Sequence, residues 1–300
     1  MKKFVGFEAI AQGQNHKEKD IVCQDAVCFK PYTNGGVVVA ADGHGSEKHF
    51  RSQYGAEIAV RITHSGIFDF SRLYVNDFKK RQEPPKHLYM EKQLEQLKRF
   101  IITRWRQEVI KHFSENPLTD KEKSICQGLG IDTENENHKV HAYGTTLIAA
   151  LLQKTSWLVI QIGDGKSVLI DAEGNPSFAV DEDERLGFGM TTSLCDSNAA
   201  ANFRHAFDFT EIKGITVATD GVSDSFIPEA YLELNKKIYT DFCSNPAAAG
   251  EWVKKGFASW SLQGSGDDAS MAGIFSVPVG TWDKAKDVMS SLLEGKPKLN

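Results

Sequence analysis

Short apolar runs that border an aspartate recur along this chain and constrain its fold more than any other feature. They precede Asp42 in VVVAADGHGS, Asp164 in LVIQIGDGKS and Asp220 in ITVATDGVSD, while Asp25 in CQDAV and Asp267 in GSGDDAS lie close to further apolar segments. Runs of this length, rich in β-branched residues, predict buried strands, so these carboxylates are expected at strand ends. Clustered carboxylates repel one another unless a cation binds them, and hard oxygen ligands suit Mg²⁺ or Mn²⁺. The pattern therefore favours a metal-dependent hydrolase, although a turn role for any single Asp-Gly pair stays open.

Six segments, taken in chain order, resemble the signatures of a known family. They are QDA, ADGHG, YGTT, GDGK, TDGVSD and GDDAS. The PPM/PP2C family of protein serine/threonine phosphatases carries approximately (E/Q)D, DGHGG, GTT or GST, GDSR, TDGLWD and DN at these places. The resemblance covers residues 4 to about 277, and the early Gly-Gln-Asn-His and Cys-Gln-Asp segments are closer to a bacterial branch. It implies an α+β fold, a four-layer α-β-β-α sandwich of two antiparallel sheets flanked by helices.

The resemblance also implies a site for two divalent cations, Mg²⁺ or Mn²⁺. Asp42 would bridge both ions, with the carbonyl of Gly43 as a further ligand. Asp220 and Asp267 would hold the first ion, and Asp25 would hold metal-bound waters. A hydroxide between the ions would attack phosphorus directly, so no covalent phospho-enzyme is expected.

Three further aspartates lie in these motifs or beside them. Asp164 matches the aspartate of GDSR, which implies contact with a third metal ion, and a simple turn role stays open. Asp224, four residues after Asp220, is predicted to cap a helix that begins near Phe226. Asp268 stands where the family often has asparagine.

His44 is the predicted general acid. It follows Asp42 and Gly43 directly, and a positioned imidazolium that protonates the leaving alkoxide contributes about 10²–10⁴-fold. A hydrogen bond to metal-bound water is the alternative role. The remaining histidines, apart from His16, are expected at the surface or in packing: His49, His64, His87, His112, His138, His141 and His205.

The phosphate-binding group departs from the family pattern. Asp20 occupies the place where animal members carry a phosphate-binding arginine. We expect His16 to bind the substrate phosphate instead, with Lys17 and Lys19 as rivals.

Composition limits the other function classes. The net charge is -5, from 35 basic and 40 acidic residues, so no field favours nucleic acid. We expect no signal peptide, and the sequence has no apolar run of about 18 residues, which predicts a cytoplasmic protein without a membrane partner. The five cysteines form no zinc-type pairs, and none has an arginine six positions later as a thiolate phosphatase requires. We expect a monomer that acts on a phosphoprotein substrate.

Periodicity predicts a single domain over residues 1–300, with a polar loop or insertion near 114–140 and an irregular, flap-like segment near 171–214. Ser46 is predicted to cap a helix that ends at His64. The other predicted helices cover 86–114, 227–242, 246–260 and 281–293, and the predicted strands cover 4–11, 37–41, 145–152, 157–162, 167–170, 215–219 and 271–276.

These observations favour a metal-dependent protein serine/threonine phosphatase. A catalytically silent phosphatase-like binding module and a metal phosphohydrolase for small molecules are the alternatives. The presence of all the core aspartates and of His44 argues against the silent module.

Overall fold

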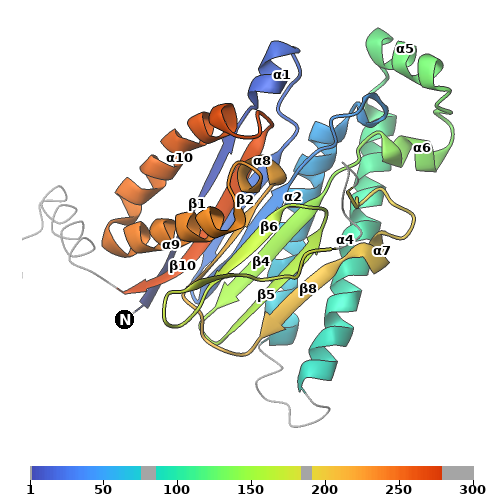
Figure 1. Cartoon of the computed structure of the whole chain (residues 1–300). Helices are drawn as coiled ribbons and strands as arrows, with labels where there is room; N and C mark the ends of the chain where they lie inside the picture. The colour runs from blue at the N-terminus through green and yellow to red at the C-terminus, as the bar shows by residue number, and fades with distance from the viewer. Residues whose placement is uncertain (1, 76–85, 184–190, 279–300) are drawn as a thin grey trace, which may run out of the picture.

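Two five-stranded antiparallel sheets form the centre of the molecule (Figure 1). The computed structural model describes residues 2–75, 86–183 and 191–278. The first sheet has the order β1 (Lys2–Ala11), β10 (Ala269–Pro278), β9 (Gly214–Ala218), β6 (Lys166–Ile170) and β7 (Pro176–Phe178). The second has the order β2 (Ala26–Tyr32), β3 (Gly35–Ala41), β4 (Leu147–Gln153), β5 (Ser156–Ile162) and β8 (Arg204–Asp208).

Helices cover the outer face of each sheet (Figure 1). α2 (Ser52–Phe70) packs on the second sheet and α4 (Lys86–Glu115) packs on α2, while α9 (Pro228–Ser244) and α10 (Pro246–Gln263) pack on the first sheet. The shorter elements are α1 (Gln14–Glu18), the 3₁₀ turn η1 (Glu47–His49), the π-helical turn η2 (Ser71–Val75), α5 (Asp120–Leu129), α6 (Glu136–His141), α7 (Ala199–Asn202) and α8 (Asp220–Ser223). The expected α+β sandwich of four layers is confirmed.

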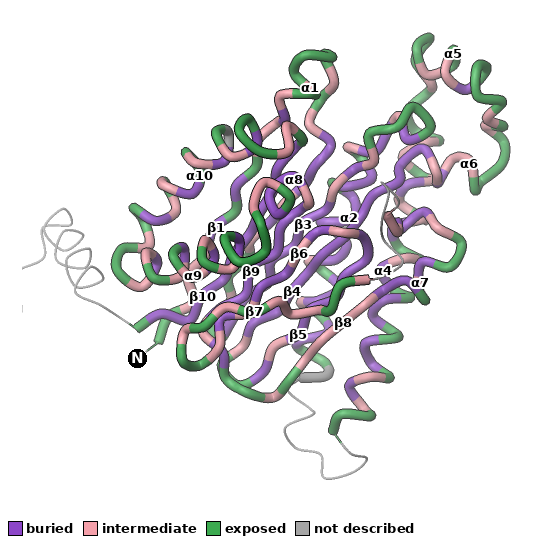
Figure 2. The backbone as a smooth tube through the Cα atoms, viewed as in Figure 1, coloured by how far each residue is buried: buried purple, intermediate pink, exposed green. Residues whose placement is uncertain are grey.

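Strand β3 shows why the sheets stack in layers. All seven of its residues are buried, because successive side chains point to opposite faces and both faces are covered. Val37 and Val39 face the core under α2 and α4, whereas Val38 and Ala40 face the other sheet. The purple strands in the middle of Figure 2 are therefore the two inner layers.

Strand register sets where the chain turns at one edge of the sandwich. In the second sheet Ala40 pairs with Ile148 and Leu147 pairs with Ile162, so the segments after β3 and β5 emerge together. In the first sheet Ala218 pairs with both Lys166 and Met271. The β5–β6 turn, the end of β9 and the start of β10 therefore meet at that edge.

Several sequence expectations about elements were wrong. The helix expected from Ser46 to His64 is α2, which begins at Ser52 and ends at Phe70, and Ser46 makes no side-chain capping bond. Asp224 does not cap α9, because α9 begins at Pro228 with Ile227 at its N-cap position.

The expected loop near 114–140 is wrong as a description of its structure, since it contains α5 and most of α6. A capping box between Thr119 and Glu122 begins α5. Whether this segment is an insertion stays a prediction. The segment near 171–214 is more regular than expected, because β7, α7 and β8 lie within it.

Strand β2 was not predicted, and the predicted helix 281–293 lies outside the described residues. None of the helices in the described ranges is long and apolar enough to span a bilayer.

Candidate metal centre

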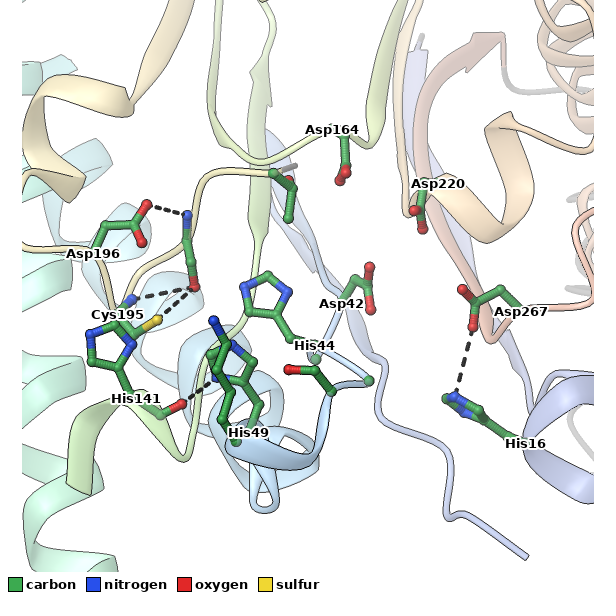
Figure 3. Close-up of a pocket in the computed structure, with 16 residues that line it drawn as sticks. His16, Asp42, His44, His49, His141, Asp164, Cys195, Asp196, Asp220 and Asp267 are labelled. Carbon is green, nitrogen blue, oxygen red and sulfur yellow. Dashed lines mark hydrogen bonds and ion pairs between the residues drawn. The ribbon is translucent and has the colours of Figure 1, made fainter. Parts of the chain in front are cut away.

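Three aspartates from different strand ends converge at the edge of the sandwich. Asp42 follows β3, Asp164 lies in the β5–β6 turn and Asp220 begins α8 directly after β9 and Thr219. One carboxylate oxygen of each lies within 4.8 Å of those of the other two. Figure 3 shows these side chains pointing toward a common space. This donor set of hard oxygen atoms fits a divalent cation such as Mg²⁺ or Mn²⁺.

The Tyr143–Thr146 turn holds Asp42 in place. The carbonyl of Asp42 accepts hydrogen bonds from Thr145 Oγ1 and from the Thr146 backbone N–H, both at 2.8 Å. Thr146 Oγ1 in turn accepts from the Asp42 N–H at 3.1 Å. The side chain of Asp42 is thus presented by a backbone that is fixed from both sides.

The turn that carries Asp164 requires a glycine. Gly163 has φ 105°, and a Cβ there would lie 2.5 Å from Thr146 Cβ. A residue with a side chain would be strained at this φ and would collide with Thr146. The glycine before Asp164 therefore lets the β5–β6 turn approach the turn that holds Asp42.

The crowded carboxylates of this cluster would be stabilised by a bound cation. Burial, followed by the charges of Asp25 and Asp220, raises the pKa of Asp42 well above its ordinary value. Burial and the neighbouring carboxylates of Asp164 and Asp267 raise the pKa of Asp220 to about 7. A bound cation would stabilise the ionised forms that this crowding disfavours.

The two other expected ligands differ in position. The side chain of Asp267 is 53% exposed and lines the same cavity as Asp42 and Asp220. Asp25 does not line the cavity; it lies buried behind it, where its Oδ2 accepts from Thr219 Oγ1 at 2.8 Å. Burial raises the pKa of Asp25 to about 8, and its Oδ1 has no hydrogen-bond partner within the described ranges.

Asp268 organises the segment that carries His16. Its carboxylate accepts from the backbone N–H groups of Gly13 and Gln24, at 2.7 and 2.6 Å, and contacts His16 Nδ1 at 2.8 Å. His16 Nε2 lies 3.9 Å from Asp267 Oδ1 at the cavity wall. One ring nitrogen of His16 is therefore committed to Asp268, and the other faces Asp267.

Histidines form the opposite wall of the cavity. His44, His49 and His141 all line it, with ring centroids of His44 and His49 4.8 Å apart (Figure 3). His49 is buried and its Nδ1 contacts the carbonyl of His141, as expected of a packing residue, but both histidines also line the cavity. Burial lowers the pKa of His44 and of His49 to about 4. In the sequence, only position points to a role for His49 and His141 in the site. His49 follows the Asp42–Gly45 turn closely, and His141 precedes the Tyr143–Thr146 turn closely.

The cavity itself measures about 690 Å³. It is also lined by residues that the sequence did not single out for the site: Lys48, Thr191, Ser193, Cys195 and Asp196. Lys17 and Lys19 are not among its lining residues. A volume of this size lies in the range of ordinary ligand sites, roughly 300–1,000 Å³.

Comparison with known proteins identifies the family. The sequence model of the family described as Protein phosphatase 2C matches residues 12–255, which is most of the chain. The chain belongs to the protein phosphatase 2C family. No curated protein sequence matched it significantly.

Solved structures of similar fold agree with this membership in the protein phosphatase 2C family. PppA, described as a key regulatory component of T6SS in Pseudomonas aeruginosa, is 14% identical with a TM-score of 0.54, covering 91% of this chain and 97% of its own. The serine/threonine phosphatase Stp1 from Staphylococcus aureus is 13% identical with a TM-score of 0.53, covering 93% and 96%. At such identities the likeness concerns the fold alone. The roles of individual residues at the centre stay predictions.

Proposed function

We propose that this chain is a Mg²⁺- or Mn²⁺-dependent protein phosphatase that hydrolyses phosphoserine and phosphothreonine. The observation that carries the proposal is the convergence of Asp42, Asp164 and Asp220 within 4.8 Å in a chain of the protein phosphatase 2C family. When bound, a pair of divalent cations would supply a hydroxide nucleophile near neutral pH and neutralise the phosphoryl oxygens.

The chain's own residues divide the remaining work. Asp42, Asp220 and Asp267, with the carbonyl of Gly43, would hold two cations, and Asp164 would add a contact for a third. Asp25, buried behind them, would accept hydrogen bonds from metal-bound waters through Oδ1, for which the described residues provide no partner. The role of each ligand is part of the proposal.

No cysteine in this cavity suits nucleophilic attack. Cys195 is the cysteine that lines it among the described residues, and burial raises the pKa of this thiol. A thiol with a raised pKa forms little thiolate near neutral pH, and the thiolate is the reactive species. This supports direct attack on phosphorus without a covalent phospho-enzyme.

His44 is proposed as the general acid for the leaving alkoxide. Burial, with the nearby Lys48, lowers its pKa to about 4, so the ring is mostly neutral before substrate binds. A phosphoryl dianion beside the ring would favour the imidazolium form, because an opposite charge within a few ångströms stabilises it. His16 is proposed to face the substrate phosphate, although Asp268 already holds its Nδ1.

The test is hydrolysis of an aryl phosphate and of a phosphoserine peptide, with Mn²⁺, without added metal, and with a chelator. Activity is expected only with metal. Asp220→Asn should keep the far-ultraviolet circular dichroism of the wild type, weaken Mn²⁺ binding measured by calorimetry, and lower turnover by at least ~10²-fold.

Asp241→Asn is the matched control, since Asp241 lies on α9, pairs with Lys237 and does not line the cavity. It should behave as the wild type in every assay. Wild-type rates for Asp220→Asn at saturating Mn²⁺ would refute the assignment of the centre. Hydrolysis of small phosphate esters without any phosphopeptide activity would favour a small-molecule phosphohydrolase instead.

A further inference from the structure

The cavity extends beyond the carboxylates into a second region. Figure 3 shows Asp42, Asp164, Asp220 and Asp267 to one side of His44, with His49, His141, Cys195 and Asp196 to the other. We call the wall formed by His44, Lys48, His49 and His141 the basic arm. A single phosphoryl group bound at the metal centre would engage His44 but would leave Lys48, His49 and His141 without a ligand.

Lys48 gives the arm its cationic character. Among the described residues, no other lysine or arginine lines the cavity, and the side chain of Lys48 is exposed. Its ammonium has no ion-pair partner among those same residues. After burial, the charge of Lys48 contributes to the lowered pKa values of His44, His49 and His141, so it lies within electrostatic reach of all three rings.

The negative group in this region is already engaged. Asp196 Oδ2 accepts from the Ser193 N–H at 2.8 Å and from Asn202 Nδ2 at 3.3 Å. Thr191 Oγ1, also at the cavity wall, is buried without a hydrogen-bond partner in the described part of the chain. Within the described residues, the arm and its surroundings therefore present an ammonium without an ion-pair partner and a hydroxyl without a hydrogen-bond partner. Asp196 beside them keeps its charge but is held in place by Ser193 and Asn202.

We infer that the basic arm is a specificity subsite that binds a second anionic group of the substrate, a carboxylate or a phosphate near the scissile phosphoserine or phosphothreonine. Lys48 supplies the charge that selects it. This inference rests on the proposed phosphatase function and adds a preference for acidic or multiply phosphorylated segments. A lysine suits this task because its mobile ammonium pairs with either anion as a point charge.

The dimensions fit neighbouring residues of one peptide. The His44 and His49 centroids are 4.8 Å apart and those of His49 and His141 are 6.4 Å apart, so the histidine wall of the arm is several ångströms long. An extended peptide advances about 3.3–3.6 Å per residue. Because Lys48 lines the same cavity as the carboxylates, we place the second anionic group on a side chain within a few residues of the phosphoresidue.

The experiment compares phosphoserine peptides that differ only in their flanks: glutamine, glutamate, or a second phosphoserine. We measure kcat/KM for phosphate release at saturating Mn²⁺ and, separately, peptide affinity by fluorescence anisotropy. The wild type should prefer acidic flanks about fivefold, the selectivity that one partly exposed ion pair provides. Lys48→Gln should lose that preference, Lys48→Glu should invert it, and added salt should weaken it in the wild type.

Lys254→Gln, which removes an exposed lysine of α10 away from the cavity, is the matched control and should keep the wild-type preference. An unchanged preference in Lys48→Gln would overturn the inference. If Lys48→Gln lowered kcat/KM equally on peptides with neutral and with acidic flanks, the inference would also be overturned. Lys48 would then act on the scissile phosphoryl group itself. If only phosphoserine flanks raise kcat/KM, the arm binds phosphate. If glutamate flanks raise it as well, the arm also binds a carboxylate.

The two proposals fail in different ways. Hydrolysis of all peptides without any dependence of flank preference on Lys48 would remove the subsite and leave the phosphatase function standing. Lys48-dependent binding of acidic peptides without metal-dependent hydrolysis would remove the phosphatase function and leave the subsite standing.

Discussion

Replacing Glu122 with glutamine is expected to destabilise the protein by about 2–3 kcal/mol, because it removes the counter-charge of a buried guanidinium. The side chain of Arg51 is 3% exposed, and that of Glu122 is 15% exposed. Arg51 Nε donates to Glu122 Oε1 at 2.6 Å, and Nη2 donates to Oε2 at 3.1 Å. Arg51 directly precedes α2, whereas Glu122 lies in α5, so this pair fastens the 114–140 segment to the start of α2.

The size of this loss in unfolding free energy depends on the hydrogen bonds that Arg51 keeps in Glu122→Gln. Removing one partner of a buried ion pair usually costs about 3–5 kcal/mol. Glutamine keeps one acceptor oxygen, and Arg51 Nη1 still donates to the hydroxyl of Tyr143 at 3.1 Å. These contacts reduce the expected loss below that range, to about 2–3 kcal/mol. In the double variant Arg51→Met/Glu122→Gln no charge is left unpaired, so its loss should be smaller than the sum of the single losses.

The free energy of unfolding from urea titration is the measurement, with Glu115→Gln as the control. Glu115 pairs with Lys111 at 3.9 Å, and both side chains are 63% exposed. Removing that pair should cost no more than about 0.5 kcal/mol. A loss for Glu122→Gln as small as that of the control would refute the argument, because Arg51 would then not depend on its partner.

The pH dependence provides a second check. Burial disfavours the ionised form of Glu122, but hydrogen bonds from Arg51 and Thr119 outweigh it and lower its pKa below the ordinary value of 4.5. A depressed pKa in the folded state means that the carboxylate stabilises the protein above its unfolded pKa. The gap between wild type and Glu122→Gln should therefore be constant near neutral pH and shrink as the pH falls below about 4.5 through the folded pKa.

Two further changes test the cavity. His44→Ala should slow phosphoserine peptides by ~10²-fold or more and aryl phosphates much less, because only the alkoxide needs an acid; equal losses in kcat at matched Mn²⁺ would mean that His44 organises the site rather than donating a proton. Gly144→Ala would place a Cβ 2.5 Å from His49 Nδ1 and 2.7 Å from His44 Cδ2. It should cost about 1–3 kcal/mol of unfolding free energy and lower activity, and a variant of wild-type stability would show that both rings move freely.

Local sequence patterns predicted the elements with strong periodicity. Spacings of three and four along Leu94, Leu97, Ile101, Trp105, Val109 and Phe113 predicted the helix that the structure has as α4. The first five side chains are buried, and Phe113 is partly buried against the same core. The strands that lead into Asp42, Asp164 and Asp220 were predicted because each is covered on both faces and so consists almost wholly of apolar residues.

Weak or mixed patterns explain the elements that were missed. β8 is a strand of sequence RHAFD at the edge of its sheet, where β5 is its one partner among the described strands. It is half-exposed along most of its length, so it has little apolar signal. β2 contains Lys30 and Pro31, which are unusual in a strand. The capping box of α5, Thr119 followed by Glu122 three residues later, was a local signal that could have revealed that helix.

The sequence by itself determined the positions of Asp42, Asp164 and Asp220 at strand ends, because strand periodicity and Asp-Gly turns are properties of a few neighbouring residues. Tertiary structure alone decided which other groups share their cavity. Gly144 brings the turn after α6 against His44 and His49, across about a hundred residues of chain, and Lys48 enters the same cavity only because η1 is folded there. Such contacts depend on strand register and packing between distant segments, which no local pattern encodes.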